Sequence, residues 1–218
     1  MLDIFTREGL IVFLYSLPAL LLSLSVHEYA HALVAYKLGD NTQKLRGRLT
    51  LFPLSHIDII GFISIALFGF GWGKPVIVDD TNFKNKKRDN MLVSIAGPIS
   101  NLILAIIFTA LFKIFYETNL FGLANINIDV TTNIFQMMYN IISLNIVFAI
   151  FNMIPIPPLD GARLLFYILP KKYENYYYML YKYSFIIVII LFITNLGSVI
   201  ITPVYKILMD FVSFFILL

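Results

Sequence analysis

The stretch Ser23–Asp40, SLSVHEYAHALVAYKLGD, places three ionisable side chains in a run that is otherwise mostly apolar. His27, Glu28 and His31 form the pattern H-E-x-x-H. On a helix, positions i and i+4 lie on one face, so both imidazoles can reach one metal ion, with Glu28 beside the first of them. Zinc suits this set, because it binds imidazole nitrogen and lowers the pKa of a bound water to about 7.

The composition of the 218-residue chain indicates a membrane protein. Hydrophobic residues make up 59% of it, charged residues only 13%, and the mean hydropathy is +0.83. Soluble domains have roughly 45–50% apolar and about 25% charged residues, so this chain could not cover its own surface in water. Chance polar residues remain an alternative for the His/Glu cluster, but one charge at the bilayer centre costs ~2.5–3.5 kcal/mol, which favours a functional role. The small net charge of +3 is typical of basic membrane loops and argues against a nucleic-acid partner.

Apolar runs predict an all-α bundle of about five to six transmembrane helices. We expect spans at residues 9–36, 91–115, 132–153 and 183–201, and a further one at 204–218. Gly39 is a plausible stop for the first span. The run at 57–72 is short and rich in glycine, which favours a re-entrant or interfacial segment over a full crossing. Alternating residues in GRLTLF (47–52) and KPVIVDD (74–80) predict short strands or a hairpin on either side of it.

Basic residues orient this bundle. They follow the first span, precede the second and follow the third, whereas the connection at 116–131 contains no Lys or Arg. All three basic regions can face the cytoplasm only if the run at 57–72 does not cross, and the N-terminus then lies outside. The N-terminal run lacks a basic n-region, so we expect a retained anchor and not a cleaved signal.

A third metal ligand is sought in FNMIPIPPLDGARLLF (151–166), since the chain has no cysteine. Prolines 155, 157 and 158 must end or unwind the third span, and Asp160 follows them. Asp160 could be an ordinary helix N-cap. However, His27 lies 18 residues beyond Gly9, or about 27 Å along a helix, which puts it near the cytoplasmic end of its span. Asp160 lies at the same side, so the two could meet at a common depth.

These motifs together resemble the site-2 protease family of intramembrane zinc metalloproteases. H-E-x-x-H in a first core helix and N-x-x-P-x-P-P-L-D-G in a third carry the resemblance, and AGPISN (96–101) is similar to the family's A-G-P-x-x-N. The segments RGRLTLFPLSHIDIIGFI and GWGKPV resemble small bacterial members without PDZ or CBS domains. The similarity extends over residues 23–166, about two thirds of the chain.

The resemblance implies that His27, His31 and Asp160 bind zinc and that Glu28 is the general base. It also implies that Asn152, eight residues before Asp160, donates to the developing oxyanion; a helix-to-helix hydrogen bond is the alternative. Asn101 is a candidate substrate contact, although a role in helix packing is favoured for it.

His56 is the remaining histidine and could be a further ligand, a substrate contact or a loop residue. We favour a role near the entrance of the active site. The two predicted strands could bind an extended substrate by strand addition, or they could be ordinary hairpins.

The sequence therefore predicts a single membrane-embedded peptidase domain over residues 1–218, with a catalytic core at about 9–168 and C-terminal helices at about 169–218. The predicted activity is that of a zinc-dependent endopeptidase with one Zn²⁺ per chain. It would act on membrane-spanning or membrane-associated proteins near the cytoplasmic side of a bacterial cell membrane. A membrane metal-binding or transport protein, or a catalytically silent scaffold, is the alternative. The oligomeric state is open.

Overall fold

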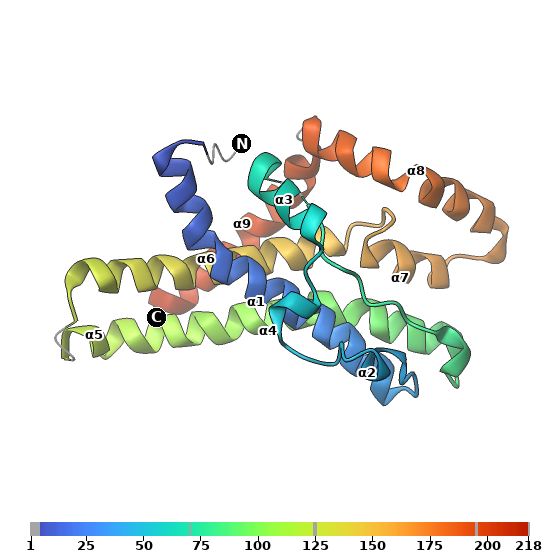
Figure 1. The fold of residues 1–218 in the computed structure, drawn as a ribbon, viewed down its shortest axis with the longest axis horizontal. Helices are drawn as coiled ribbons and strands as arrows, with labels where there is room; N and C mark the ends of the chain where they lie inside the picture. Colours follow the sequence, from blue (N-terminus) through green and yellow to red (C-terminus); the bar gives the residue numbers. More distant parts are fainter. Residues whose placement is uncertain (1–4, 70, 124–125, 195, 218) are drawn as a thin grey trace.

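Figure 1 shows an all-helical chain in the computed structural model, which describes residues 5–69, 71–123, 126–194 and 196–217. Five of its helices are long and apolar enough to cross a membrane, namely α1 (Arg7–Lys37), α4 (Lys86–Glu117), α6 (Ile128–Asn152), α8 (Glu174–Ile193) and α9 (Leu196–Leu217). Shorter elements in the described part are α2 (Thr42–Leu45), α3 (Ile59–Phe68), α5 (Leu120–Leu123), α7 (Asp160–Ile168) and 3-10 turns at Pro53–Ser55, Asp80–Asn82 and Lys171–Tyr173. The prediction of a multi-pass helical membrane protein is confirmed.

Apolar runs become helices here because a bilayer offers no hydrogen-bond partner to the backbone. The ends of the helices carry ordinary signals: Thr6, Asn85 and Asn127 each accept a hydrogen bond from a backbone N–H of the first turn of α1, α4 and α6. α1 ends two residues before Gly39, whose φ of 115° terminates the helix as predicted. The three spans predicted at 9–36, 91–115 and 132–153 agree with α1, α4 and α6 to within five residues at each end.

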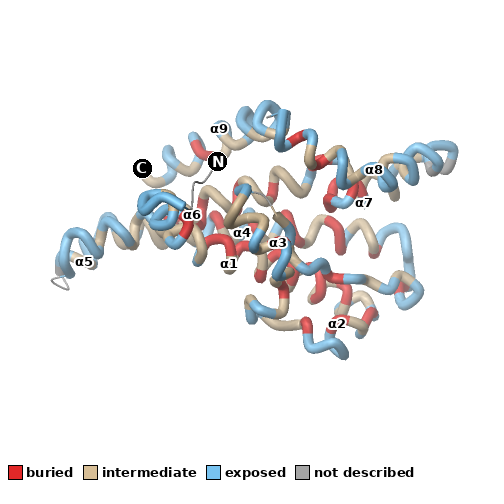
Figure 2. The backbone as a smooth tube through the Cα atoms, turned by 45° about the horizontal axis from the view of Figure 1, so that its top comes forward, coloured by how far each residue is buried: buried red, intermediate tan, exposed pale blue. Residues whose placement is uncertain are grey.

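The core of the bundle consists of α1, α4 and α6, which lie side by side. Small residues at their contacts, such as Ala32 and Ala35 of α1 and Ala105 of α4, are buried and let the helices approach closely. Figure 2 shows that buried residues gather on these three helices, whereas most of α8 and α9 is exposed. The functional side chains described below all lie on or against this core.

The strands predicted at 47–52 and 74–80 are wrong, since no strand is present in the part of the chain that the structure describes. One isolated antiparallel bridge joins Ile57 to Gly73. In the segment 74–79, the N–H of Lys74 donates to the backbone carbonyl of His56. Five other backbone groups bond to side chains from other segments and not to a neighbouring strand: the carbonyls of Lys74, Pro75 and Ile77, and the N–H groups of Val76 and Asp79.

The run at 57–72 forms a helix too short to cross a bilayer. α3 has ten residues, about 15 Å of helix against the ~30 Å of a hydrocarbon core. It ends at Gly69, whose φ is 72°, and the bridge brings the two ends of the run together. After α3 the chain packs closely against the start of the helix. A Cβ on Gly61 would lie 2.1 Å from the carbonyl oxygen of Trp72, and one on Gly71 would lie 1.9 Å from the carbonyl oxygen of Gly61.

The predicted boundary between the last two spans is also wrong. α8 ends at Ile193 and α9 begins at Leu196, so that Pro203 lies inside α9 and not between two helices. The two helices have similar mean hydropathies, 1.7 and 1.8, so overall apolar content does not say where one ends and the next begins. A proline inside a membrane helix is tolerated because neighbouring helices can satisfy the freed backbone groups.

Candidate metal centre

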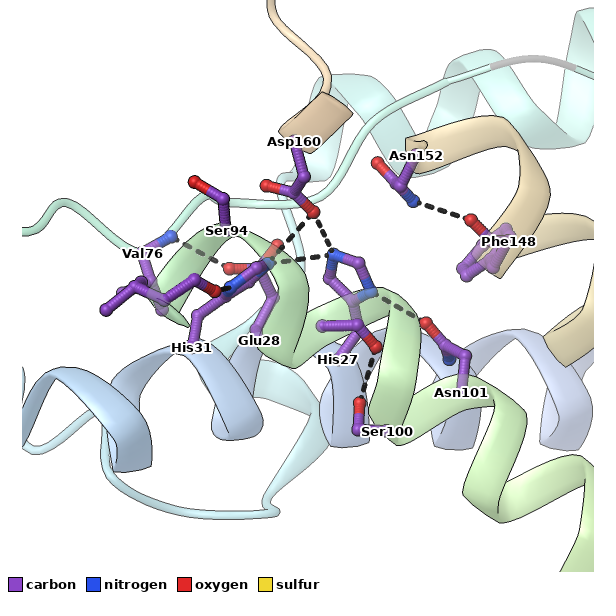
Figure 3. Close-up of polar contacts among 12 residues, drawn as sticks. His27, Glu28, His31, Val76, Ser94, Ser100, Asn101, Phe148, Asn152 and Asp160 are labelled. Atoms are coloured by element: carbon purple, nitrogen blue, oxygen red, sulfur yellow. Dashed lines mark hydrogen bonds and ion pairs between the residues drawn. The ribbon is translucent and has the colours of Figure 1, made fainter. Parts of the chain in front are cut away.

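His27 and His31 lie one turn apart on the buried face of α1. Their Nε2 atoms are 3.1 Å apart, and Figure 3 shows both rings directed toward Asp160. The Oδ2 atom of Asp160 is 3.1 Å from each Nε2 atom. Three potential ligand atoms therefore form a triangle with equal sides, although Asp160 lies 129 positions after His31 in the sequence.

Asp160 reaches the histidines through the turn that follows α6. It is the first residue of α7, and the N-cap position belongs to Leu159, which makes no side-chain cap bond. The Asp160 carboxylate is thus directed at the histidines and does not serve as a helix cap. Gly161 permits this approach, since a Cβ there would lie 2.3 Å from the carbonyl oxygen of Met153.

The donor set and its spacing fit a zinc ion. Metal–ligand bonds of about 2.0–2.1 Å at tetrahedral angles put two ligand atoms roughly 3.4 Å apart, close to the observed 3.1 Å. All three residues are buried, with exposed fractions of 5% for His27, 6% for His31 and 7% for Asp160. Three protein ligands leave a fourth position for water or substrate, as in catalytic zinc sites.

In each imidazole, the hydrogen bond made by Nδ1 fixes the tautomer. His31 Nδ1 lies 2.7 Å from the backbone carbonyl oxygen of Val93 in α4, and a carbonyl can only accept, so Nδ1 carries the proton. His27 Nδ1 lies 2.7 Å from Oδ1 of Asn101. Both Nε2 lone pairs are then directed at the centre of the triangle, the usual arrangement of metal-binding histidines.

The orientation of the Asn101 amide follows from its other partners. Its Nδ2 donates to the carbonyl of Ser23 at 3.1 Å and to Oδ1 of Asn145 at 2.7 Å. Asn145 Nδ2 in turn donates to the carbonyl of Ile141 at 2.7 Å. With these acceptors fixed, the oxygen of Asn101 must face His27. Both asparagines are fully buried, so the chain Asn145–Asn101–His27 links α6, α4 and α1.

Gly97 lies where α4 comes nearest to the two rings. A Cβ at this position would be 2.4 Å from His31 Nε2, 2.5 Å from His27 Cε1 and 2.6 Å from His27 Nε2. Any side chain would therefore overlap both potential ligand atoms. The close packing of α4 against the histidines depends on the absence of a side chain here.

Glu28 stands beside the triangle with its carboxylate anchored. Its Oε2 atom accepts a hydrogen bond from the backbone N–H of Val76 at 2.8 Å, and Figure 3 shows Val76 approaching from the segment opposite α1. Glu28 is 8% exposed and is adjacent in sequence to His27. This position suits a base that must reach a water at the metal.

Arg48 holds the segment that anchors Glu28. Its guanidinium donates to the carbonyls of Lys74 and Pro75 at 2.6 and 2.7 Å, and to the carbonyl of Ser55 at 3.2 Å. The side chain is largely buried, unlike that of the exposed Arg46. The planar guanidinium presents its N–H donors in a fixed fork that suits two successive carbonyls, whereas the ammonium of lysine is a single point charge on a flexible stem.

The far end of the same segment is fixed by Gln43 and Asp40. Gln43 Nε2 donates to the carbonyl of Ile77, and Asp40 Oδ2 accepts from the N–H of Asp79 at 2.9 Å. Burial acts to raise the pKa of the Asp40 carboxyl, but hydrogen bonds from Thr42, Asp79 and Asn82 together hold that pKa below its usual value. Asp40 is therefore an ionised acceptor at neutral pH.

Three other residues predicted to belong to the site form hydrogen bonds outside the triangle of His27, His31 and Asp160. Asn152 Nδ2 donates to the carbonyl of Phe148 in its own helix at 3.0 Å, so its role toward an oxyanion stays a prediction. Asn101 lies behind His27 and is fully buried. His56 is also fully buried, with Nε2 2.7 Å from the carbonyl oxygen of Thr50. Substrate contact by Asn101 and His56 stays a prediction, and neither side chain offers an exposed surface for it.

Sequence reasoning missed the residues that support the site. Gly97 stood within a motif but without an assigned role, and Arg48 was counted only as a basic loop residue. Asn145 was not singled out, although a polar residue in an apolar helix was a usable signal. The accepting carbonyl of Val93 has no signal in sequence at all.

Comparison with known proteins adds a family match. The model of peptidase family M50 matches residues 15–196. The chain is 40% identical over 202 residues to "Putative zinc metalloprotease YwhC" of Bacillus subtilis, covering 93% of this chain and 90% of that protein. It is 29% identical over 189 residues to Rip2 of Mycolicibacterium smegmatis, described in the same words, covering 84% and 68% of the two chains. "Zinc metalloprotease MJ0392" of Methanocaldococcus jannaschii is 26% identical over 154 residues, covering 71% and 34%. No solved structure shows significant similarity to the chain.

Proposed function

Because the chain belongs to peptidase family M50, the site-2 protease family of zinc metalloproteases, we propose that it cleaves membrane-spanning or membrane-associated proteins. The proposed zinc ligands are His27, His31 and Asp160, with one ion per chain. Within the described residues they are the one group of His and acidic side chains whose ligand atoms converge. The observation that carries the proposal is the triangle of 3.1 Å separations, with both Nδ1 atoms occupied by outer partners.

A bound zinc would supply Lewis acidity that lowers the pKa of water and polarises the scissile carbonyl. Glu28 takes a proton from the attacking water and returns it to the amide nitrogen of the leaving strand, so the peptide bond is exchanged for a carboxyl and an amine. The Val76 N–H keeps the Glu28 carboxylate in place for both transfers. Burial of the site excludes bulk water, which strengthens each of these electrostatic interactions. Asn152, at the end of α6, is our candidate donor to the oxyanion.

The segment 74–79 is the proposed docking edge for substrate. A substrate helix hides its amides in its own hydrogen bonds, so it must be extended before cleavage. Across the described residues, the Val76 carbonyl and both backbone polar groups of Val78 have no hydrogen-bond partner. An extended peptide can pair with such groups by strand addition, immediately beside Glu28.

We further propose that the site opens toward the cytoplasm. The segments after α1, before α4 and around α7 carry basic residues and lie at one end of the bundle (Figure 1), the end at which α7 begins with Asp160. Cytoplasmic loops carry such an excess of Lys and Arg. The opposite connection, between α4 and α6, has none at 118–127.

The test compares purified variants for zinc content and for cleavage of a model transmembrane substrate. Glu28→Gln should abolish cleavage and keep zinc, whereas Asp160→Ala should lose zinc. Glu117→Gln, an exposed carboxylate at the end of α4, is the matched control and should keep both. Full cleavage by Glu28→Gln would refute its role as base, and wild-type zinc affinity in Asp160→Ala would refute the third ligand.

A further inference from the structure

The outer face of α9 carries two charged side chains at mid-depth in the bundle. Lys206 and Asp210 are both exposed. Their neighbours fix their depth: Tyr205 shares a hydrogen bond of 2.8 Å with Ser143 of α6, and Met209 packs in a cluster with residues near the middle of α4 and α6. Lys206 and Asp210 therefore lie far from both ends of the spanning helices.

Neither charged side chain has a polar partner among the described residues. Across the described part of the chain, Lys206 and Asp210 take part in no hydrogen bond and no ion pair. They are four residues apart, so a change of rotamer could pair them on their own helix. Such a pair would still face hydrocarbon, where ionisable groups are rare and normally face protein or water.

The polar face continues from α9 onto α6. Gln136, Tyr139, Asn140 and Ser143 recur on α6 at helical spacing, and Gln136 Nε2 donates to Asn140 Oδ1 at 3.0 Å. Ser143 connects this row to α9 through Tyr205. In membranes, polar side chains of this kind gather at contacts between helices. Figure 2 shows α9 at the outer edge of the protein, and most of its described residues, Lys206 and Asp210 among them, are exposed.

We propose that the polar face of α9 and α6, defined by Gln136, Tyr139, Asn140, Lys206 and Asp210, binds the same face of a second copy of this chain. Two copies in one membrane have the same orientation, so a two-fold axis along the membrane normal sets their α9 helices parallel. Lys206 of one copy then lies opposite Lys206 of the other. Asp210 of that other copy is four residues, or about 6 Å, further along the helix axis. A lysine side chain spans that distance. Symmetry forms both ion pairs at once, and this self-complementarity is the reason for choosing a second copy as partner.

The absence of cysteine from the chain allows a direct test. Ser213 lies on the same face as Lys206 and Asp210, at spacings of seven and three residues, whereas Phe211 is exposed on another face. In vesicles at low protein density, Ser213→Cys should form a disulfide-linked dimer under oxidation, and Phe211→Cys should form about tenfold less. Equal cross-linking at the two positions, or none at Ser213→Cys, would overturn the proposal.

Charge exchange tests the pairing itself. In the Ser213→Cys background, Lys206→Asp should lower the cross-linked fraction about tenfold, because four carboxylates would then meet at the interface. Adding Asp210→Lys restores opposite charges and should restore the dimer. Zinc content and detergent-solubilised yield report whether each variant has folded. Folded Lys206→Asp that cross-links as the parent does, or a folded double variant that stays monomeric, would contradict pairing between copies.

Discussion

Substitution of Gly97 by alanine should weaken zinc binding without destabilising the fold. The added Cβ would lie 2.4 Å from His31 Nε2 and 2.6 Å from His27 Nε2, whereas ordinary contact begins at 3.4 Å. The two nitrogens must therefore retreat by about 1.0 Å (3.4 − 2.4) and 0.8 Å (3.4 − 2.6). Zinc sites tolerate only about ±0.2 Å in ligand distance.

The imidazoles cannot retreat freely, because their Nδ1 atoms are bonded to Asn101 and to the Val93 carbonyl. We expect Gly97→Ala to weaken zinc binding by about 10–100-fold or more, in line with changes to the surroundings of metal ligands. The helix itself should not suffer, since alanine is favoured over glycine in a helix interior by ~1 kcal/mol. The variant should thus insert and fold while losing metal.

Competition titration against a zinc chelator measures the affinity, and thermal unfolding of the metal-free protein measures the fold. Gly197→Ala is the control, because its Cβ would meet nothing nearer than 3.5 Å. Wild-type zinc affinity in Gly97→Ala would refute the argument that α4 is held against both ligand atoms at this position.

Three further outcomes follow from the same contacts. Asn145→Ala should weaken zinc binding about tenfold in the same titration, because it removes the acceptor that orients the Asn101 amide toward His27. An unchanged zinc affinity would count against the Asn145–Asn101–His27 network. Arg48→Lys should lower kcat about 100-fold with zinc content intact, because a misplacement near 1 Å is that costly, while Arg46→Lys should match wild type in peptidase assays. Gly61→Ala should destabilise the protein by roughly 1–3 kcal/mol in thermal unfolding, since its Cβ would lie 2.1 Å from the Trp72 carbonyl oxygen; an unchanged midpoint would show that the return after α3 can shift freely.

The core helices, and the placement of His27 and His31 on one face of α1, could be predicted from sequence for a common physical reason. In a bilayer an apolar run must satisfy its backbone internally, so it becomes a helix whatever its neighbours are. Once α1 is a helix, the four-residue spacing of His27 and His31 sets them on one face. The meeting of Asp160 with them required only that two oppositely directed spans end at the same side.

The failed strand prediction has an equally physical cause. Alternation of polar and apolar residues indicates an extended segment with two different faces, but it does not say what bonds the backbone. Here Arg48, Gln43, Glu28 and Asp40 provide the hydrogen bonds that a neighbouring strand would provide. Such side-chain partners come from distant parts of the chain, so local periodicity could not reveal them.

The role of Gly97 and of Asn145 was beyond sequence reasoning for a related reason. A glycine in a helix is only a weak signal until the residue facing it is known. The same is true of a buried asparagine, because any other helix can supply its partners. The role of both residues depends on the packing of α4 against His27 and His31.

The proposed metal ligands and the proposed catalytic base are held by separate parts of the molecule. His27 and His31 are held by α4 through Asn101, Val93 and the gap at Gly97. The Glu28 carboxylate is held instead by the segment 74–79, which Arg48 fixes from outside the core. Changes in α4 or α6 should therefore alter zinc affinity first, and changes in the segment should alter turnover at constant zinc content. If Asn145→Ala and Arg48→Lys instead lost zinc and turnover in the same proportion, the site would have to be regarded as a single unit.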